Sequence, residues 1–287
     1  MTITSTTVQP PEPAESWASS AITFIRKRPD LTISPLILVV LLLAWHYATK
    51  IYEIPSFILP PPVEVWDALV GGLATGFGDK AGFWYHGGVT VWESLLGFFI
   101  GSGVGVVMGF ALARWRFLEA ISLPYIIGFQ ALPKIALAPL LIIWFGFGIE
   151  GKVLISAILT FFPVLVNSMA GYRSVDPTRI DLARSCNASE WQIFCKISLP
   201  SSLPFVFAGL NVASILAMLG AIVGEFVGAR SGLGMLLLQY EQSMQIAPVF
   251  AVLLVLAFIG YAMNVAIRMV ERKYCFWVER AGPQAEA

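Results

Sequence analysis

The chain has 287 residues, of which 57% are hydrophobic and 13% are charged, and its mean hydropathy is +0.77. Soluble domains carry about 25% charged residues, so this composition excludes an ordinary soluble protein and predicts an integral membrane protein. The formal net charge is zero and the longest basic run is 26–28, which argues against a nucleic-acid partner. The three cysteines, Cys186, Cys195 and Cys275, lack the spacing of a metal site, so no metal ligands are expected.

The N-terminal segment changes character near residue 30. Residues 1–25 are polar and rich in Pro, Ser and Thr, so we expect 1–30 to be a disordered cytoplasmic tail. An apolar run, 31–48, follows the basic residues 26–28. A cleaved signal peptide is the alternative interpretation, but the bulky sequence HYATKIYEIP after the run does not resemble a small-residue cleavage site. We therefore expect an uncleaved first transmembrane helix.

Long apolar segments recur along the rest of the chain. A spanning helix needs about 20 apolar residues, and six segments qualify: 31–49, 88–113, 118–148, 152–172, 201–227 and 246–270. The predicted fold is therefore all-α, a polytopic membrane helix bundle with six transmembrane helices.

The distribution of Lys and Arg predicts the orientation of these spans. With the N-terminus inside, the inner segments hold 13 basic residues and the outer segments hold four, including Lys152, while Lys134 falls within a span. Because cytoplasmic loops are enriched in Lys and Arg, we expect both termini, including a C-terminal tail at 273–287, to be cytoplasmic.

The outer segment 54–75 begins with a proline cluster and continues with apolar residues at helical spacing. Val63, Trp66, Leu69 and Val70 would lie on one face of a short amphipathic helix at the outer membrane interface.

The segment 118–148 is too long for one straight crossing and is interrupted by Pro124, Pro133 and Pro139. A broken helix is tolerated within a membrane where protein or a water-filled cavity covers the freed backbone groups. Lys134 lies near mid-depth, where an ionisable group is a functional candidate. The candidate residues of a solute path are therefore Gln130, Pro133, Lys134 and, in the fifth span, Glu225. The alternatives are a kinked helix without solute contact, and an ion pair of Lys134 with Glu225 or Glu93.

Two spans carry ladders of small residues. Glycine recurs every fourth position at 97–109 and again at 220–228. Such stripes allow helix backbones to approach closely, within one chain or across a dimer interface.

The segment 146–153 nearly fits a phosphate-binding loop, but Val153 lacks the hydroxyl that would hold Mg²⁺ and no strand precedes it. We expect no nucleotide site there.

The loop 173–200 is a polar island between two apolar spans. Asp176 and Pro177 suit the cap and first position of a helix, and Asn187 suits a left-handed turn between two short helices. Trp191 and Phe194 are large apolar groups on this water-facing loop. They favour a protein-binding contact, with packing against the bundle or the lipid interface as the alternative.

The same loop, DLARSCNASEWQIFCKISLP, keeps the spacing of the motif E-A-A-x3-G-x9-I-x-L-P. Asp181 replaces the Glu of the motif, and Asn187 replaces its Gly. The chain therefore resembles the binding-protein-dependent permeases of ABC importers, whose EAA motif this is. The stretches 59–66, 131–148, 161–177 and 220–234 resemble the nitrate/taurine/sulfonate-type branch, and the resemblance covers about 35–272. The motif positions are Asp181, Leu182, Ala183, Asn187, Ile197, Leu199 and Pro200.

The resemblance implies a type I ABC importer permease with a MetI-like core, in a transmembrane domain at 31–272 that includes the loop 173–200. It implies a second permease copy in a homodimer, two cytoplasmic ATPase subunits that bind ATP and Mg²⁺, and an extracytoplasmic solute-binding protein, in a bacterial inner membrane. The chain itself would hold no cofactor and no catalytic site. A coupling helix near 184–191 would dock on the ATPase, oriented by Asp181 and Arg184, with Trp191 or Phe194 filling an apolar notch.

Two other function classes compete with this one. An ion-coupled secondary transporter would need no ATPase, but the spans contain no chain of Asp, Glu and His of the kind proton-coupled transporters use. A membrane-embedded enzyme would need a catalytic pair, and neither His46 nor His86 has an evident partner in the sequence. The substrate is not readable from the sequence, although the stretches PKIALAPL and GAIVGEFVGA resemble the pyrimidine and riboflavin members somewhat more.

Overall fold

The structure is a computed structural model that describes residues 29–76, 79–80 and 82–277, and every regular element among them is helical. The chain divides into two compact units, 1–63 and 64–287. Most of the predicted N-terminal tail (1–28), its basic run and part of the predicted C-terminal tail (278–287) lie outside the described residues.

The first unit contains one long helix, α2 (Pro29–Ile51), which includes the predicted first span. It begins with proline. Proline suits the first position of a helix because the first N–H groups of a helix have no hydrogen-bond partner within it. The stretch Pro35–Ile51 is its apolar part and is shorter than the four long apolar helices of the second unit.

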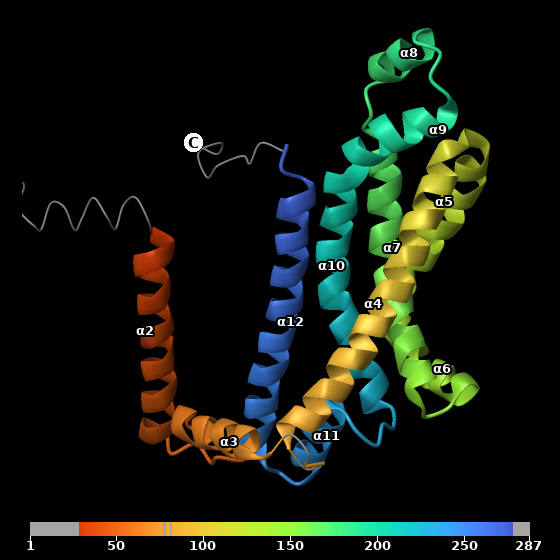
Figure 1. Cartoon of the computed structure of the whole chain (residues 1–287). Helices are drawn as coiled ribbons and strands as arrows, with labels where there is room; N and C mark the ends of the chain where they lie inside the picture. Colours follow the sequence, from red (N-terminus) through yellow and green to blue (C-terminus); the bar gives the residue numbers. More distant parts are fainter. Residues whose placement is uncertain (1–28, 77–78, 81, 278–287) are drawn as a thin grey trace, which may run out of the picture. The chain divides into compact units, whose positions relative to one another are not determined.

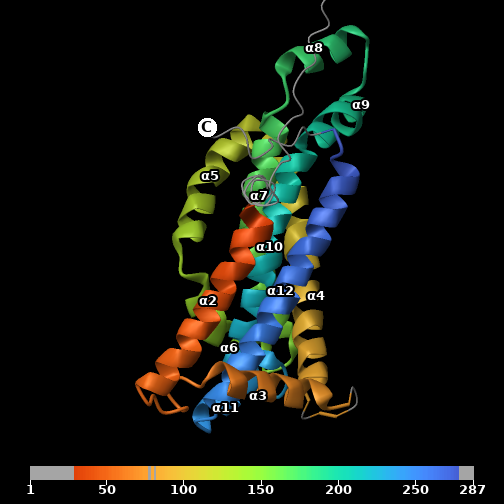
Figure 2. The same ribbon diagram turned by 90° about the vertical axis from the view of Figure 1, so that its left-hand side faces the viewer.

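The second unit begins within α3 (Pro62–Ala74), the short helix expected from its apolar spacing. Three long helices form its centre: α4 (Phe83–Arg114), α7 (Ile149–Arg173) and α10 (Leu199–Phe226). Helix α7 lies against both others, and α12 (Ile246–Tyr274) and α11 (Leu233–Gln242) pack beside α10 (Figures 1 and 2). The four long helices agree with four of the predicted spans to within a few residues.

Glycines explain how α7 fits between its two neighbours. A Cβ atom added at Gly105 of α4 would lie 2.8 Å from the Phe161 carbonyl oxygen of α7, and one at Gly224 of α10 would lie 3.1 Å from the Lys152 Cα atom. Such distances leave no room for a side chain, so the helix backbones approach closely. Of the two interpretations of the ladders, the structure shows packing within the chain for these glycines: Gly97, Gly101, Gly105, Gly109, Gly220 and Gly224.

The predicted third span is broken. It forms α5 (Arg116–Ala131), a 3₁₀ turn η1 (Lys134–Leu137) and α6 (Ala138–Phe145), with a bend of 80° between the two halves. Leu132 is extended, with ψ 137°, because a residue before proline is pushed out of the helical region. Of the three prolines expected to interrupt this span, Pro133 lies at the break, whereas Pro124 lies inside α5 and Pro139 lies in the first turn of α6.

Length and composition give four helices that could each cross a membrane among the described residues, or five if the bent pair forms one span. The expected six crossings are consistent with this set when α2 is added. At one end of the second unit the chain forms α8 (Pro177–Ser185), α9 (Glu190–Ile193) and a π-helical turn η2 (Phe194–Ser198) that continues into α10 (Figure 1).

Candidate functional site

The loop 173–200 is built from strong local signals. Asp176 caps α8, where its Oδ1 accepts a hydrogen bond from the Thr178 backbone N–H at 2.9 Å, and Pro177 occupies the first helical position. The hydrogen bonds from Thr178 hold the pKa of the Asp176 carboxyl below its usual range. Both features agree with the prediction for the start of this helix.

Asn187 turns the chain after α8. Its φ of 58° lies in the left-handed region, and the Ala188 N–H donates to the Ala183 carbonyl at 3.0 Å, which closes the helix end. Ser189 then caps α9 in a reciprocal pair with Gln192. The predicted left-handed turn is confirmed. No single helix spans 184–191, because 186–189 form the turn between α8 and α9, and the docking role of this segment stays a prediction.

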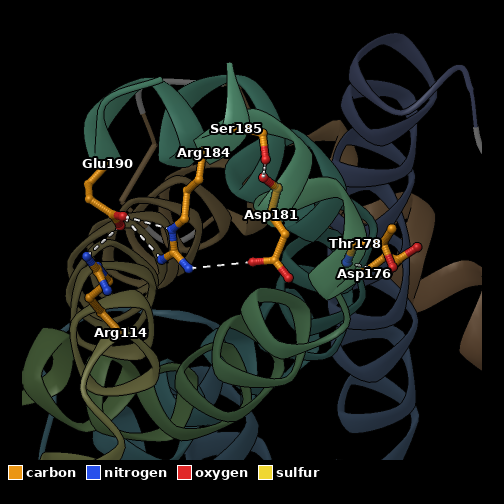
Figure 3. Close-up of polar contacts among 7 residues, drawn as sticks. All are labelled: Arg114, Asp176, Thr178, Asp181, Arg184, Ser185 and Glu190. Atoms are coloured by element: carbon orange, nitrogen blue, oxygen red, sulfur yellow. Dashed lines mark hydrogen bonds and ion pairs between the residues drawn. The ribbon is translucent and has the colours of Figure 1, made fainter. Parts of the chain in front are cut away.

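Glu190 is the centre of a polar network that ties the loop to α4. Its Oε2 atom lies 2.7 Å from Arg114 Nη2 and its Oε1 atom lies 3.2 Å from Arg184 Nη2. Arg184 also reaches Asp181 Oδ1 at 3.8 Å, one turn back on α8. Figure 3 shows the Glu190 carboxylate between the two guanidinium groups. One carboxylate thus links α8, α9 and the end of α4.

The roles of Arg114 and Glu190 were not foreseen from the sequence. The two residues lie 76 positions apart, and no local pattern reports such a pairing. A second ion pair of this kind joins Glu119 of α5 to Arg173 at the end of α7. The two ion pairs connect the helix ends around the loop.

The aromatic residues of the loop divide into an anchor and an exposed group. Phe194 packs edge-on against Phe110 of α4 with ring centroids 5.6 Å apart. Trp191 stacks on Phe194 but remains 72% exposed. A hollow of about 330 Å³ lies beside them, lined also by Trp115 and Tyr172. Phe194 therefore packs back on the bundle, whereas Trp191 stays accessible to a partner.

The predicted loop residues fall into two groups by burial. Asp181, Arg184 and Asn187 are exposed, as is Trp191, while Ala183 is half-buried on α8. The remaining three are half-buried in η2 and the start of α10, at the base of the loop: Ile197, Leu199 and Pro200. The structure brings the first group to one protruding surface.

The candidate path residues lie in two separate places. Lys134 is half-buried at the bend between α5 and α6, where its Nζ atom donates to the Gln130 carbonyl at 3.0 Å. The same ammonium group lies 4.9 Å from the centre of the Phe162 ring, a cation–π distance. Pro133 adjoins it at the break, but Glu225 is elsewhere, buried in the α10 end of the bundle.

Glu225 belongs to a buried polar cluster between α4, α10 and α11. Its Oε1 atom accepts from Thr90 Oγ1 at 2.7 Å and its Oε2 atom accepts from the Gly234 N–H at 2.6 Å. Thr90 in turn accepts from the Leu233 N–H at 2.9 Å. This carboxyl group therefore fastens the start of α11 to α4.

Glu93 pairs with Lys152, and both side chains are buried. The suggested pairing of Lys134 with Glu93 or Glu225 is therefore wrong in this structure. The placement of Lys152 in an outer loop was also wrong, because it lies inside α7. The positive charge of Lys152 is offset by the carboxylate of Glu93, which lies 59 positions away in the sequence.

His86 has partners on both ring nitrogens, which the sequence did not reveal. Its Nδ1 atom accepts from the Gly232 N–H at 3.0 Å, and Nε2 lies 2.8 Å from the Lys80 carbonyl oxygen and donates to it. It thus orders the segment before α11. Among the described residues no group of three His, Cys, Asp or Glu side chains is placed to hold a metal ion.

Comparison with known proteins gives one consistent family. Residues 101–274 match the family described as binding-protein-dependent transport system inner membrane component. A probable ABC transporter permease of Haemophilus influenzae is 33% identical over 86% of this chain and 98% of its own length. The riboflavin transport system permease RibX of Chloroflexus aurantiacus is 35% identical over 85% of this chain and 89% of its own.

A solved structure shares the fold. The MetNI methionine ABC transporter in inward-facing conformations aligns with 64% of this chain and 94% of the matched chain, at a TM-score of 0.53 and 21% identity. These findings support the importer interpretation and not the ion-coupled secondary transporter. The chain belongs to the family of binding-protein-dependent inner membrane components and is the transmembrane permease subunit of an ATP-binding-cassette importer.

Proposed function

We propose that separate ATPase subunits drive this permease through the loop 173–200, and that the solute crosses by alternating access. The observation that carries this proposal is the Glu190 network, in which α8, α9 and α4 are joined by ion pairs. Through η2 the loop also continues directly into α10. A displacement of α8 would therefore be passed to two of the three central helices.

The exposed surface of the loop has the composition of a contact site. Leu182 and Trp191 are 67% and 72% exposed on an otherwise polar protrusion. Aromatic and apolar groups of this kind are enriched where one protein binds another. The ion pair of Asp181 and Arg184 would orient the exposed surface of α8. Ala183 is half-buried on the same helix, where a larger or charged side chain would disturb this surface.

The assembly follows from the family and from charge. We infer two ATPase subunits, an extracytoplasmic solute-binding protein and a second copy of this chain as a homodimer. The excess of Lys and Arg on the loop side favours a cytoplasmic location for the loop and both termini. Differential contact of the loop with two ATPase states would then couple ATP use to access.

The solute path is proposed to run past the α5–α6 bend. Gln130, Pro133 and Lys134 gather there, and a broken helix beside a cationic group suits a polar or anionic solute. Glu225 is buried and both of its carboxylate oxygens accept hydrogen bonds from the chain, and we infer a structural role for it. A small organic solute of the heterocyclic type is the first class to test, because one relative is a riboflavin permease.

The test is reconstitution of the whole importer with an Ala183→Asp permease. We expect loss of both solute uptake and binding-protein-stimulated ATP hydrolysis, with normal membrane insertion. Ser243→Asp is the matched control, because Ser243 is exposed at the far end of α11. Normal uptake by Ala183→Asp, or equal loss in Ser243→Asp, would refute the assignment of the loop.

A further inference from the structure

A polar hollow lies between α10 and α12, where α12 ends. Figure 1 places this end of α12 at the end of the second unit that carries α8 and α9. The hollow has a volume of about 410 Å³, within the range of about 300–1,000 Å³ typical of small-molecule sites. Its lining includes Asn211, Arg268, Glu271, Arg272, Cys275 and Phe276.

The hollow carries a net positive charge. Arg268 and Arg272 lie one helical turn apart and so share a face of α12. Within the described part of the chain, neither guanidinium group has an ion-pair partner. The nearby Glu271 carboxylate instead accepts from Asn211 Nδ2 at 2.9 Å. Two guanidinium groups against one carboxylate favour an anion, and the guanidinium fork matches a phosphate.

Asn211 adds a hydrogen-bond acceptor. Its Oδ1 atom is buried and has no partner among the described residues. A buried polar atom without a partner is costly, so a ligand that supplies a hydroxyl donor would satisfy it. The chemistry of the hollow therefore suits a group with both a phosphate and a hydroxyl.

The position of the hollow points to the membrane surface. The apolar span α12 ends at Tyr274 and is followed by the exposed side chains of Phe276 and Trp277. Aromatic residues gather where a span leaves the hydrocarbon core. Basic pockets between helices at this membrane–water interface bind the anionic head groups of lipids. We propose that the α10–α12 hollow binds the phosphate of a glycerol-bearing anionic phospholipid, through Arg268 and Arg272, with Asn211 accepting from a headgroup hydroxyl.

Cys275 lines the hollow and reports its occupancy. The test uses the full-length permease with Cys186→Ser and Cys195→Ser, in nanodiscs of phosphatidylcholine with or without phosphatidylglycerol. We expect phosphatidylglycerol to slow alkylation of Cys275 by N-ethylmaleimide. Arg268→Gln and Arg272→Gln should each weaken this protection about fivefold, because one basic residue near an anionic lipid contributes about 1 kcal/mol. The Arg→Lys variants should keep most of it.

Two controls isolate the effect. Arg230→Gln removes the same charge from an exposed site in the turn between α10 and α11 and should keep full protection. A permease with Cys186 as its one remaining cysteine measures how the lipid charge alone changes thiol reactivity.

Soluble ligands distinguish the source of the phosphate. Glycerol 3-phosphate or inorganic phosphate, added to phosphatidylcholine nanodiscs, should protect Cys275 far less than phosphatidylglycerol does. Equal protection by either soluble ligand would overturn the lipid assignment and leave a soluble-phosphate site. Equal alkylation rates under all conditions, or equal loss of protection in Arg230→Gln, would overturn the site itself.

Discussion

The buried pair of Lys152 and Glu93 allows a sharp test of how the bundle is held together. The two residues are 5% and 1% exposed, respectively, and form an ion pair between α7 and α4. Lys152→Met keeps the aliphatic stem, against which Gly224 of α10 packs, but removes the charge. The Glu93 carboxylate would then be buried without a cation.

The expected loss is large. Removing one partner of a buried ion pair costs about 3–5 kcal/mol, which reduces the ratio of folded to unfolded protein by about two to four orders of magnitude. The double variant Lys152→Met with Glu93→Gln has neither charge and should recover most of the loss. A double-mutant cycle then gives the interaction energy of the pair.

The assay is denaturant unfolding of the purified permease in mixed micelles, followed by tryptophan fluorescence. Lys80→Met is the control, because Lys80 is exposed and its loss should change the unfolding free energy by no more than about 0.5 kcal/mol. The reasoning is refuted if Lys152→Met is as stable as the wild type, or if the double variant is no more stable than the single one.

Three further predictions concern packing, the loop and the thiols. Gly101→Leu should lower the melting temperature, because its Cβ atom would overlap the Ala157 carbonyl of α7 and overpacking costs about 1–3 kcal/mol; Gly103→Leu, with open space at its Cβ position, should not. Asn187→Val should cost about 1–2 kcal/mol at a left-handed position and make the loop more sensitive to limited proteolysis, whereas Asn187→Gly should behave like wild type. Burial, and secondarily the charge of Glu271, raises the pKa of the Cys275 thiol, so its thiolate forms only at higher pH than an ordinary thiol. Mass spectrometry should therefore show Cys275 alkylation rising with pH long after the exposed Cys186 has reacted, and an impermeant reagent should reach Cys186 only in inverted vesicles.

Local rules predicted the parts of the fold that depend on neighbouring residues. Asp176 with Pro177 marked the start of α8, Asn187 marked the turn, and Pro133 was one of the three prolines that marked the third span as interrupted. Each of these residues acts on the backbone within a few positions of itself. Their effects can therefore be read without knowing what packs nearby.

Pairings between helices were not predictable in this way. Lys152 follows the glycine-rich stretch 146–151, which suggested a loop, and only the close approach of α4 to α7 brings Glu93 to its ammonium group. The same holds for Arg114 with Glu190 and for Glu225 with Thr90, whose partners come from different helices. Burial of a charge requires a specific partner, but a single sequence does not say which one.

The position of α7 between two glycine-lined helices limits how this permease can change shape. Because backbone meets backbone at these glycines on both sides, α4 and α10 have little room to slide past α7. We therefore expect the three helices to move as one rigid unit. In the proposed alternating access, this unit would rock against the second permease copy, or α5 and α6 would swing about the Leu132–Pro133 joint, without rearrangement among α4, α7 and α10.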